Sequence, residues 1–441
     1  MDLAKRAYDQ TYRIDPIVRS LLDTDFYKLL MAQFIFDRYA GVEVTFGLIN
    51  RTKTVRLADI VPESQLRAQL DYVRTLRFRE NELIWIAGAT FYGQQHIFHG
   101  RFIEFLRGLA LPDYQLAKVD GQYELTFTGP WAEVTWWEIH ALSIVSELRS
   151  RAGHCERNEI ELDLLYASAK AKLLRKLQRL KGAPGLALSD FGARRRHSFL
   201  WQEWVVLAMA EVLGRAFVGT SNAYLAFKHG FEAKGTNAHE LPMVLAAIAP
   251  DDAALADAQY RLCREWQQAY SGNLLVALPD TFGTTQFLER APAWLALDWK
   301  GYRPDSKPPI EAGEELIGWL QANGVDPNAR FVLFSDGLDV GIDGFEPNGE
   351  DLLDIHQHFA GRIGLAYGWG TNASNDFRGC DPRGESLFDP LSLVCKVKAA
   401  GGRPAVKLSD NYSKASGPAE EVERYRRVFG TAGVRGVPVR V

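Results

Sequence analysis

The stretch KGTNAHE, residues 234–240, closes an extended segment and opens an apolar helical one. In a chain of alternating strands and helices, a side chain at such a junction faces the region that the strand tips surround. This makes His239 the leading candidate for chemistry. A histidine beside a glutamate is more often a helix-start residue satisfied by capping than a catalyst, so the other strand ends must support the stronger interpretation.

Short apolar runs separated by helical segments extend on both sides of this stretch. They lie at residues 185–190, 216–219, 232–235, 274–278, 295–299, 330–334, 363–367 and 391–397. Runs of this kind predict parallel strands joined by helices, and a count near eight favours a closed or nearly closed barrel over an open sheet. We therefore expect an α/β fold in which residues 146–395 form a TIM-like β/α barrel.

Residues 1–145 have a different rhythm, in which strands pair locally. The patterns predict a helix over residues 21–39 with Asp23 and Thr24 as candidate caps, and strands over residues 42–50, 123–127 and 132–136. A strand-like run at 404–408 and a charged helix at 418–429 exceed what the barrel needs. We assign the tail from about 396 to 441 to the first domain, which becomes a discontinuous α+β domain.

Composition narrows the functional classes. With 441 residues and 47% hydrophobic content the chain can bury a large core, and two domains are the default expectation. A net charge of -4 gives no whole-chain attraction to nucleic acid or to an anionic membrane. No run of about 18 apolar residues and no signal-peptide core are found, so we expect a cytoplasmic protein that does not span a membrane.

The cysteines do not have metal-ligand spacing. They are Cys155, Cys263, Cys380 and Cys395, without a CxxC pair among them. Cys155 lies beside His154, but a second pair that would complete a zinc site is missing. We interpret all four as reduced thiols and predict no metal site built from protein ligands.

Polar or glycine residues end nearly every predicted barrel strand. These endings are residues 189–194, 219–222, 235–240, 279–281, 302–306, 335–337 and 367–372. The loops at this edge of a β/α barrel form its active site, and phosphate groups commonly bind after the last strands. Gly337 and the loop of Gly370 and Thr371 suit a phosphate, since glycine lets backbone N–H groups approach closely.

Charged residues at two endings suit an anionic sugar substrate. Asp305 and Arg303 are two residues apart in an extended segment, so both can point to one side. A carboxylate pairs well with a ribose diol and an arginine with a phosphate or carboxylate, although an isolated pair of this kind is usually a surface salt bridge. The triplet at 194–196 could suggest nucleic acid, but at least one of these arginines more plausibly serves a small anion, and Phe191 could stack on a flat ring.

Eight segments together resemble one known family, the nicotinate phosphoribosyltransferases. They are DTDFYKLLM (23–31), DFGARR (190–195), VGTSN (218–222), GTNAHE (235–240), DTFGT (280–284), RPDS (303–306), YGWGTN (367–372) and KLSD (407–410), in the family's order. The resemblance implies a type II phosphoribosyltransferase fold, an irregular α/β barrel with an N-terminal α+β domain. It also implies a homodimer whose active sites borrow residues across the interface.

The resemblance further implies the reaction. Members condense nicotinate with phosphoribosyl pyrophosphate to nicotinate mononucleotide and pyrophosphate in NAD salvage, and couple this to ATP hydrolysis through a phosphohistidine, with Mg²⁺ bound to the donor. By motif, His239 is similar to the phosphorylated histidine, Asp280 to the carboxylate that orients it, and Asp305 to the ribose contact. The 5′-phosphate contacts correspond to Gly337, Gly370 and Thr371.

The same resemblance assigns the ring site. Phe191 and Tyr27, the latter from the partner subunit, are similar to the pair that sandwiches the pyridine ring, with Arg194 close to it. Two departures are visible: Lys307-Pro308-Pro309 stands where many relatives have Gly-Asp, and the basic residues for pyrophosphate, Arg51, Lys407 and Lys414, match only loosely.

Three alternatives stay open on the sequence alone. The first is nicotinamide phosphoribosyltransferase, where an aspartate replaces Ser221 and accepts a hydrogen bond from the amide; Ser221 can instead donate to a carboxylate, or only cap the following helix. The second is a barrel that binds a nucleotide without catalysis. The third is an aldolase or isomerase, for which Lys234 and Lys300 are marginal candidates.

Overall fold

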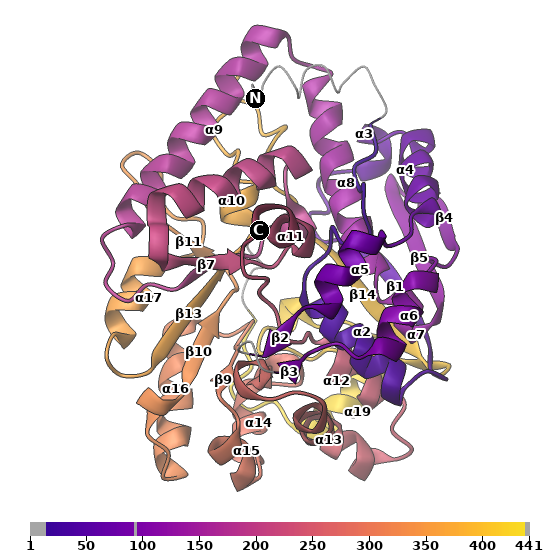
Figure 1. Cartoon of the computed structure of the whole chain (residues 1–441), viewed down its shortest axis with the longest axis vertical. Coiled ribbons are helices and arrows are strands. Elements are labelled where there is room, and N and C mark those ends of the chain that lie inside the picture. Colours follow the sequence, from indigo (N-terminus) through magenta and orange to yellow (C-terminus); the bar gives the residue numbers. More distant parts are fainter. Residues whose placement is uncertain (1–14, 92–94, 437–441) are drawn as a thin grey trace.

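Two sheets organise the chain in this computed structural model, which describes residues 15–91 and 95–436 (Figure 1). The first is a six-stranded sheet in the order β7-β6-β13-β10-β9-β8, and all of its recorded strand pairs are parallel. Its strands are β6 Leu188–Asp190, β7 Phe217–Thr220, β8 Val276–Ala277, β9 Gly301–Tyr302, β10 Phe331–Phe334 and β13 Gly364–Trp369. Because the strands are parallel, all their carboxyl ends meet at one edge.

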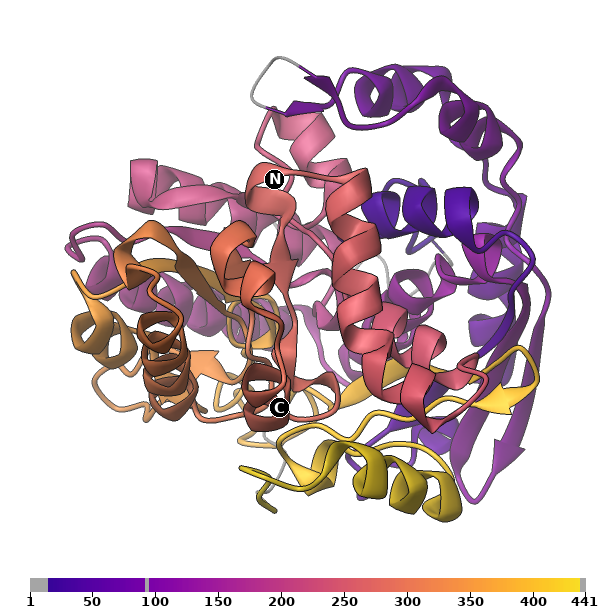
Figure 2. The same cartoon turned by 90° about the horizontal axis from the view of Figure 1, so that it is seen from below.

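The second sheet is antiparallel and has five strands in the order β15-β14-β1-β5-β4. They are β1 Glu43–Asn50, β4 Tyr114–Val119, β5 Gln122–Pro130, β14 Leu393–Ala400 and β15 Arg403–Pro404. The short pairs β2 Thr90–Phe91 with β3 Gln95–His96, and β11 Leu338–Asp339 with β12 Glu350–Asp351, complete the described strands. Figure 2 shows the yellow C-terminal segment running beside the purple N-terminal strands, as the pairing of β14 with β1 requires.

Helices cover both sheets. The earlier ones are α2 Tyr27–Arg38, α3 Leu57–Ile60, α4 Glu63–Thr75, α5 Glu80–Ala87, α6 Gly100–Gly108, α7 Trp131–Val134 and α8 Trp137–His154. The later ones are α9 Glu159–Leu180, α10 Phe199–Leu213, α11 Ala223–His229, α12 Glu240–Ala247, α13 Asp252–Ala269, α14 Thr284–Glu289, α15 Ala293–Asp298, α16 Pro309–Ala322, α17 Leu352–Phe359, α18 Thr371–Ser374 and α19 Ala419–Phe429. The longest, α9, begins with a capping box in which Asn158 and Glu161 exchange hydrogen bonds.

The prediction of an α/β fold is confirmed, but the pairs recorded among the described residues leave β7 and β8 as the ends of the parallel sheet. The segment 232–235, predicted as a strand, forms a single bridge, between Ala233 and Thr220. Asn237 Nδ2 then donates to Val276 O at 3.0 Å, so this segment spans the space between the two end strands. The segment is irregular at Gly235. This glycine packs so closely on α2 that a Cβ there would lie 2.6 Å from the backbone nitrogen of Tyr27.

Two segments predicted as strands are not strands, and a third is a strand of the other sheet. Residues 295–299 lie mostly in α15, and the strand follows at β9; short apolar runs do not distinguish the two states. Residues 132–136 begin in α7 instead of a strand. Residues 391–397 do contain a strand, β14, but it pairs antiparallel with β1 outside the parallel sheet.

The predicted cap of the first helix is also wrong. Neither Asp23 nor Thr24 caps α2, which begins at Tyr27 without a side-chain cap. Asp23 instead accepts two hydrogen bonds of 2.6 Å from the guanidinium of Arg196, and both side chains are buried. This ion pair ties the N-terminal segment to the loop after β6.

One continuous apolar core joins the two sheets. Its largest fully buried side chains are tryptophans, namely Trp131, Trp136, Trp137, Trp201, Trp266, Trp299 and Trp369. No disulfide joins the four cysteines, all of which lie among the described residues. Among residues 15–91 and 95–436, none of the helices is both long and apolar enough to cross a bilayer.

Candidate active site

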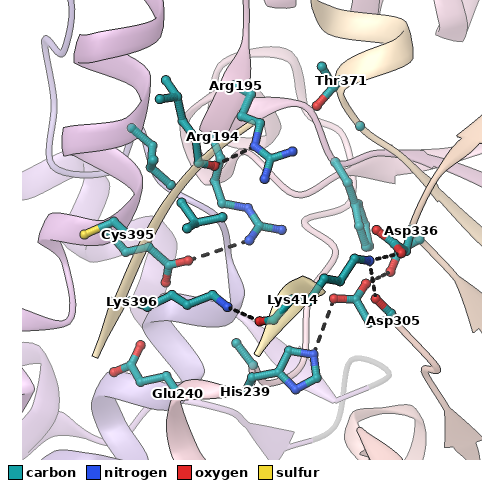
Figure 3. Close-up of a pocket in the computed structure, with 18 of the residues that line it drawn as sticks. Arg194, Arg195, His239, Glu240, Asp305, Asp336, Thr371, Cys395, Lys396 and Lys414 are labelled. Atoms are coloured by element: carbon teal, nitrogen blue, oxygen red, sulfur yellow. Dashed lines mark hydrogen bonds and ion pairs between the residues drawn. The ribbon is translucent and has the colours of Figure 1, made fainter. Parts of the chain in front are cut away.

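A cavity of about 220 Å³ lies at the carboxyl edge of the parallel sheet (Figure 3). Loops after β6, β9, β10 and β13 and the start of α12 form one side. Residues 393–397 of β14 form the other, so the antiparallel sheet supplies a wall of the site. Cavities built from the loops at this edge are where β/α proteins place their chemistry.

His239 projects into this cavity from the N-cap of α12. Its Nδ1 lies 2.8 Å from Thr281 Oγ1, and its Nε2 lies 3.3 Å from Asp305 Oδ2 and 3.4 Å from Asp280 Oδ1. Carboxylates only accept hydrogen bonds, so Nε2 carries the proton and Nδ1 keeps a lone pair that accepts from the threonine hydroxyl. Asp280 and Asp305 therefore hold the same nitrogen, and Thr281, which the sequence did not single out, holds the other.

Burial and charge fix the protonation states of this group. Burial lowers the pKa of His239, against the opposing effect of Asp280. Burial would raise the pKa of Asp305, but the hydrogen bond from His239 and the charge of Arg303 hold it well below its usual range. The pKa of Asp280 is lowered in the same way, by His239 and Lys407 against burial. Burial thus favours the neutral imidazole, and the cations Arg303 and Lys407 favour the ionised forms of the carboxylates beside it.

A group of cations faces the imidazole from the loops and from β14. Its members, all lining the cavity, are Arg51, Arg195, Lys396, Lys407 and Lys414. Lys414 forms an ion pair with Asp336, and Lys407 Nζ lies 3.3 Å from Asp280 Oδ2. Burial and the neighbouring cations, Lys407 first, hold the pKa of Lys396 well below its usual value. A concentration of positive charge this dense suits a ligand with several negative charges.

The ring site opens between two cavities. Tyr27, Phe191, Arg194 and Arg303 line both the 220 Å³ cavity and a second one of about 790 Å³, which extends along the parallel strands. Tyr27 lines the site of its own chain because α2 packs directly on the segment at Gly235. A contribution of Tyr27 from a partner subunit stays a prediction. Arg303 Nε is buried without a hydrogen-bond partner among the described residues.

Ser221 lines the second cavity but not the first. Its hydroxyl donates to Asp25 Oδ1 at 2.6 Å, and Arg194 Nε lies 3.7 Å from Asp25 Oδ2. The interpretation that Ser221 caps the following helix is wrong, because the cap of α11 is Asn222, whose side chain accepts from Leu225 N at 3.1 Å. Ser221 is thus connected to the ring site through Asp25 and Arg194.

The loops expected to hold a phosphate line the same cavity as His239. Gly337 has a φ of 62°, which favours glycine, and Gly370 approaches so closely that a Cβ would lie 3.3 Å from Phe191 O. Thr371 begins α18 beside them. Every residue predicted for the site lies in or against this region, since Asp280 contacts His239 from behind and Ser221 adjoins through Asp25.

Sequence reasoning missed Thr281, Arg195 and Lys396. Thr281 directly follows Asp280 in the DTFGT segment, and a hydroxyl next to a predicted catalytic carboxylate could have been a signal. Lys396 and Lys398 interrupt the apolar run LSLVCKVKAA at residues 391–400, where cations in a largely buried strand could also have been noticed.

The chain was compared with known protein families and solved structures. The model of the nicotinate phosphoribosyltransferase (NAPRTase) family matches residues 186–432, and the model of the NAPRTase N-terminal domain matches residues 22–146. A nicotinate phosphoribosyltransferase from Vibrio cholerae is 28% identical, with a TM-score of 0.80 and 95% of each chain covered. One from Porphyromonas gingivalis is 26% identical, with a TM-score of 0.76, covering 94% of this chain and all of that one.

A third structure, a putative nicotinate phosphoribosyltransferase from Saccharomyces cerevisiae, is 24% identical. It has a TM-score of 0.79 and covers 95% of this chain and 99% of its own. At this level of sequence identity, the similarity shows a shared fold.

Proposed function

The chain belongs to the nicotinate phosphoribosyltransferase family and has that activity, and we propose that it drives the reaction with ATP through a phosphohistidine at His239. The reaction joins nicotinate to phosphoribosyl pyrophosphate and gives nicotinate mononucleotide, for NAD salvage. The observation that carries the proposal is the imidazole itself, which faces two carboxylates on its Nε2 side in a cavity lined by the group of five cations.

The first step uses the lone pair of Nδ1. Nδ1 of His239 attacks the γ-phosphorus of ATP, the bond from phosphorus to the bridging oxygen breaks, and ADP leaves with that electron pair. Nε2 keeps its proton, which Asp280 and Asp305 hold, and their charge stabilises the imidazole as it becomes positive. The hydroxyl of Thr281 must turn away from Nδ1, 2.8 Å distant, as the phosphoryl group arrives.

The second step transfers the ribosyl group. The pyridine nitrogen of nicotinate attacks C1 of the ribose, and pyrophosphate leaves toward the cations at Arg51, Arg195, Lys396, Lys407 and Lys414. Tyr27 and Phe191 hold the ring, Arg194 and Arg303 hold its carboxylate, Asp305 contacts the ribose hydroxyls, and Gly337, Gly370 and Thr371 contact the 5′-phosphate. Charge stabilisation of the leaving group is the largest contribution that such a site makes.

Mg²⁺ fits this site as an ion shared with the substrate. Magnesium is usually bound through one or two carboxylates plus phosphate oxygens. Asp305 and Asp336 line the cavity, and Asp280 Oδ1 is buried without a hydrogen-bond partner among the described residues. These carboxylates could hold the ion, which when bound neutralises charge on the leaving pyrophosphate.

Three further points belong to the proposal. The parallel sheet acts as an irregular barrel, with segment 232–237 bridging its two end strands. If the chain forms the homodimer that the resemblance predicts, each subunit carries a complete ring site, because Tyr27 is its own. Domain limits near residues 145 and 396 and a cytoplasmic location are likewise proposed.

The test of the phosphohistidine compares His239→Asn with His358→Asn, which changes a partly exposed histidine at the far end of α17. The proteins receive nicotinate, phosphoribosyl pyrophosphate, Mg²⁺ and ATP, and both mononucleotide and ADP are measured. The His239 variant should lose ATP hydrolysis and the acid-labile phosphoryl label while keeping slow, uncoupled transfer. Full ATP-driven product formation by this variant would exclude His239 as the phosphorylated residue.

A further inference from the structure

Lys28 is a fully buried cation that lies behind the active site and lines neither cavity. Its Nζ lies 2.7 Å from Glu138 Oε2, 2.6 Å from Glu240 Oε2 and 3.0 Å from Thr135 Oγ1. These three contacts use all the donors of the ammonium group. Lys28 thus joins three segments: α2, the junction of α7 with α8, and α12.

Each of the two carboxylates on Lys28 belongs to a different part of the site. Glu240 directly follows His239, and its other oxygen accepts from Trp131 Nε1 at 2.6 Å. Glu138 accepts from the hydroxyl of Tyr27 at 3.4 Å, and its Oε1 lies 3.6 Å from Arg194 Nη1. One ammonium group therefore lies between the histidine and the ring site.

Burying Lys28, Glu138 and Glu240 together is electrostatically unfavourable. Burial works against charge on all three groups, although the two glutamates raise the pKa of Lys28, and Lys28 and Arg194 lower that of Glu138. Well-packed apolar side chains commonly hold helices together as well as a buried ion pair does, or better. Packing alone does not explain a buried lysine with two carboxylates at this place.

We propose that Lys28 is a positioning residue that couples the phosphorylation of His239 to the binding of nicotinate by sharing its charge between Glu240 and Glu138. The inference rests on the proposed phosphohistidine. A phosphoryl group on His239 adds negative charge beside Glu240, which draws the ammonium toward that side. Glu138 then loses part of its partner and turns to Arg194 and Tyr27, which sets both for the substrate ring and its carboxylate.

The coupling must work in both directions. Nicotinate binds best when Glu138 has set Arg194 and Tyr27, so its binding favours the state in which the ammonium of Lys28 lies toward Glu240, and this state in turn favours the phosphoryl group on His239. Because α2 carries Tyr27 and Lys28 as consecutive residues, a shift of the ammonium group is felt directly at the ring site.

Lys28→Met is the test, and Lys176→Met is its matched control. Lys176 is also a buried lysine with two carboxylates, Asp339 and Asp376, but it contacts the phosphate loops instead. The measurements are ATP hydrolysed per mononucleotide formed, the KM values of both substrates, and the thermal midpoint. Lys28→Met should raise the ATP ratio and the nicotinate KM at least tenfold and leave the KM of phosphoribosyl pyrophosphate within twofold. Lys28→Arg should recover part of both.

Two results would overturn the proposal. One is a folded Lys28→Met enzyme with wild-type ATP ratio and nicotinate KM; the other is the same pattern of losses in Lys28→Met and Lys176→Met, as expected of a purely structural lysine. Should Lys28→Met not fold, Glu240→Gln keeps the shape and removes one charge, and the same rise in ATP ratio is expected. A wild-type enzyme that hydrolyses no ATP would refute the phosphohistidine instead, and the nicotinate KM would still test Lys28.

Discussion

At the scale of single residues, we expect selectivity for the acid over the amide to depend on the contact between Ser221 and Asp25. The serine hydroxyl donates to a carboxylate that is already buried, and burial raises the pKa of Asp25. Arg194 lies on the other side of that carboxylate, where it can also meet the carboxylate of nicotinate. The negative charge of Asp25 near the ring site is therefore closely balanced by the positive charge of Arg194.

Ser221→Asp should upset this balance. Two carboxylates about 4 Å apart repel by roughly 4 kcal/mol at an effective dielectric of 20, and Asp25 would draw Arg194 further from the substrate. We expect kcat/KM for nicotinate to fall at least a hundredfold and nicotinamide to be bound or used better. Ser221→Ala, which removes the donor without adding charge, serves as the control and should cost far less. An unchanged preference in a folded Ser221→Asp enzyme would remove this residue from the specificity argument.

The lowered pKa of Lys396 should make the KM of phosphoribosyl pyrophosphate depend on pH. Because its pKa is lowered, it loses its charge at a lower pH than an ordinary lysine does. As pH rises through that pKa, the KM of phosphoribosyl pyrophosphate should rise, and it should recover as pH falls. Lys396→Met should show a raised KM that no longer changes over this range, whereas Lys398→Met, exposed on the same strand, should behave like the wild type. The measurement is a series of KM values against pH at constant ionic strength.

The residues found from sequence were those whose type is unusual at a strand end. His239 and Asp305 stood out because imidazole and carboxylate groups are costly beside apolar strands unless they have work to do. Thr281 was missed because a threonine after a strand is common in turns. Lys28 was missed because it is the one lysine of α2 and lies at the start of that helix, and only the fold reveals that it is buried against two carboxylates.

At the scale of elements, helix α9 positions the phosphate loops through Lys176. The Nζ of Lys176 lies 2.5 Å from Asp339 Oδ1 and 2.7 Å from Asp376 Oδ2. Asp339 also accepts from the backbone nitrogens of Val340 and Asn348, both at 2.8 Å. A residue on the outer helix thus fixes the loop after β10 and the segment after α18 together.

Lys176→Met should loosen the loop after β10 and the segment after α18, although Lys176 itself does not contact the substrate. Lys172 Nζ lies 2.8 Å from Asp376 Oδ2, so Asp376 keeps a cation while Asp339 loses its own. Breaking a buried ion pair in this way is destabilising by about 3 to 5 kcal/mol when nothing relaxes. We expect the KM of phosphoribosyl pyrophosphate to rise about tenfold, with the KM of nicotinate nearly unchanged. Urea unfolding measured in parallel should show a lower free energy. Equal changes in both KM values would contradict a role confined to the phosphate loops.

The type of most elements could be predicted, and the failures share a cause. The charged helix predicted at 418–429 was found within a residue, as α19. The runs at 295–299 and 132–136 are only five residues long, so neither period was visible. The strand at 391–397 was found but assigned to the wrong sheet, because partners far away in sequence leave no local signal.

At the scale of the whole molecule, Tyr27 lines the ring site of its own chain. Asp305 lines the same cavity, although it lies 278 positions further along the sequence. Enzymes that share sites across an interface regain activity when two inactive variants are mixed, since one mixed site then has both intact residues.

Mixing Tyr27→Ala with Asp305→Ala should therefore restore no activity. Each variant should be impaired alone, the first mainly through a nicotinate KM raised three- to tenfold, because ring stacking contributes about 0.5 to 1.5 kcal/mol. Their mixture, after subunit exchange has been verified by differently tagged chains, should have the average activity of the two. Recovery above that average would mean that subunits do exchange Tyr27.

The pairing of β1 with β14 has a consequence for folding during translation. β1 is among the first strands to emerge from the ribosome, and the strand that covers one of its edges emerges only when almost the whole chain has been made. At about 5 to 20 residues per second, this edge stays open for tens of seconds. An open edge can pair with other chains, so the N-terminal sheet depends on protection during translation, and the enzyme acquires its cation-bearing wall last.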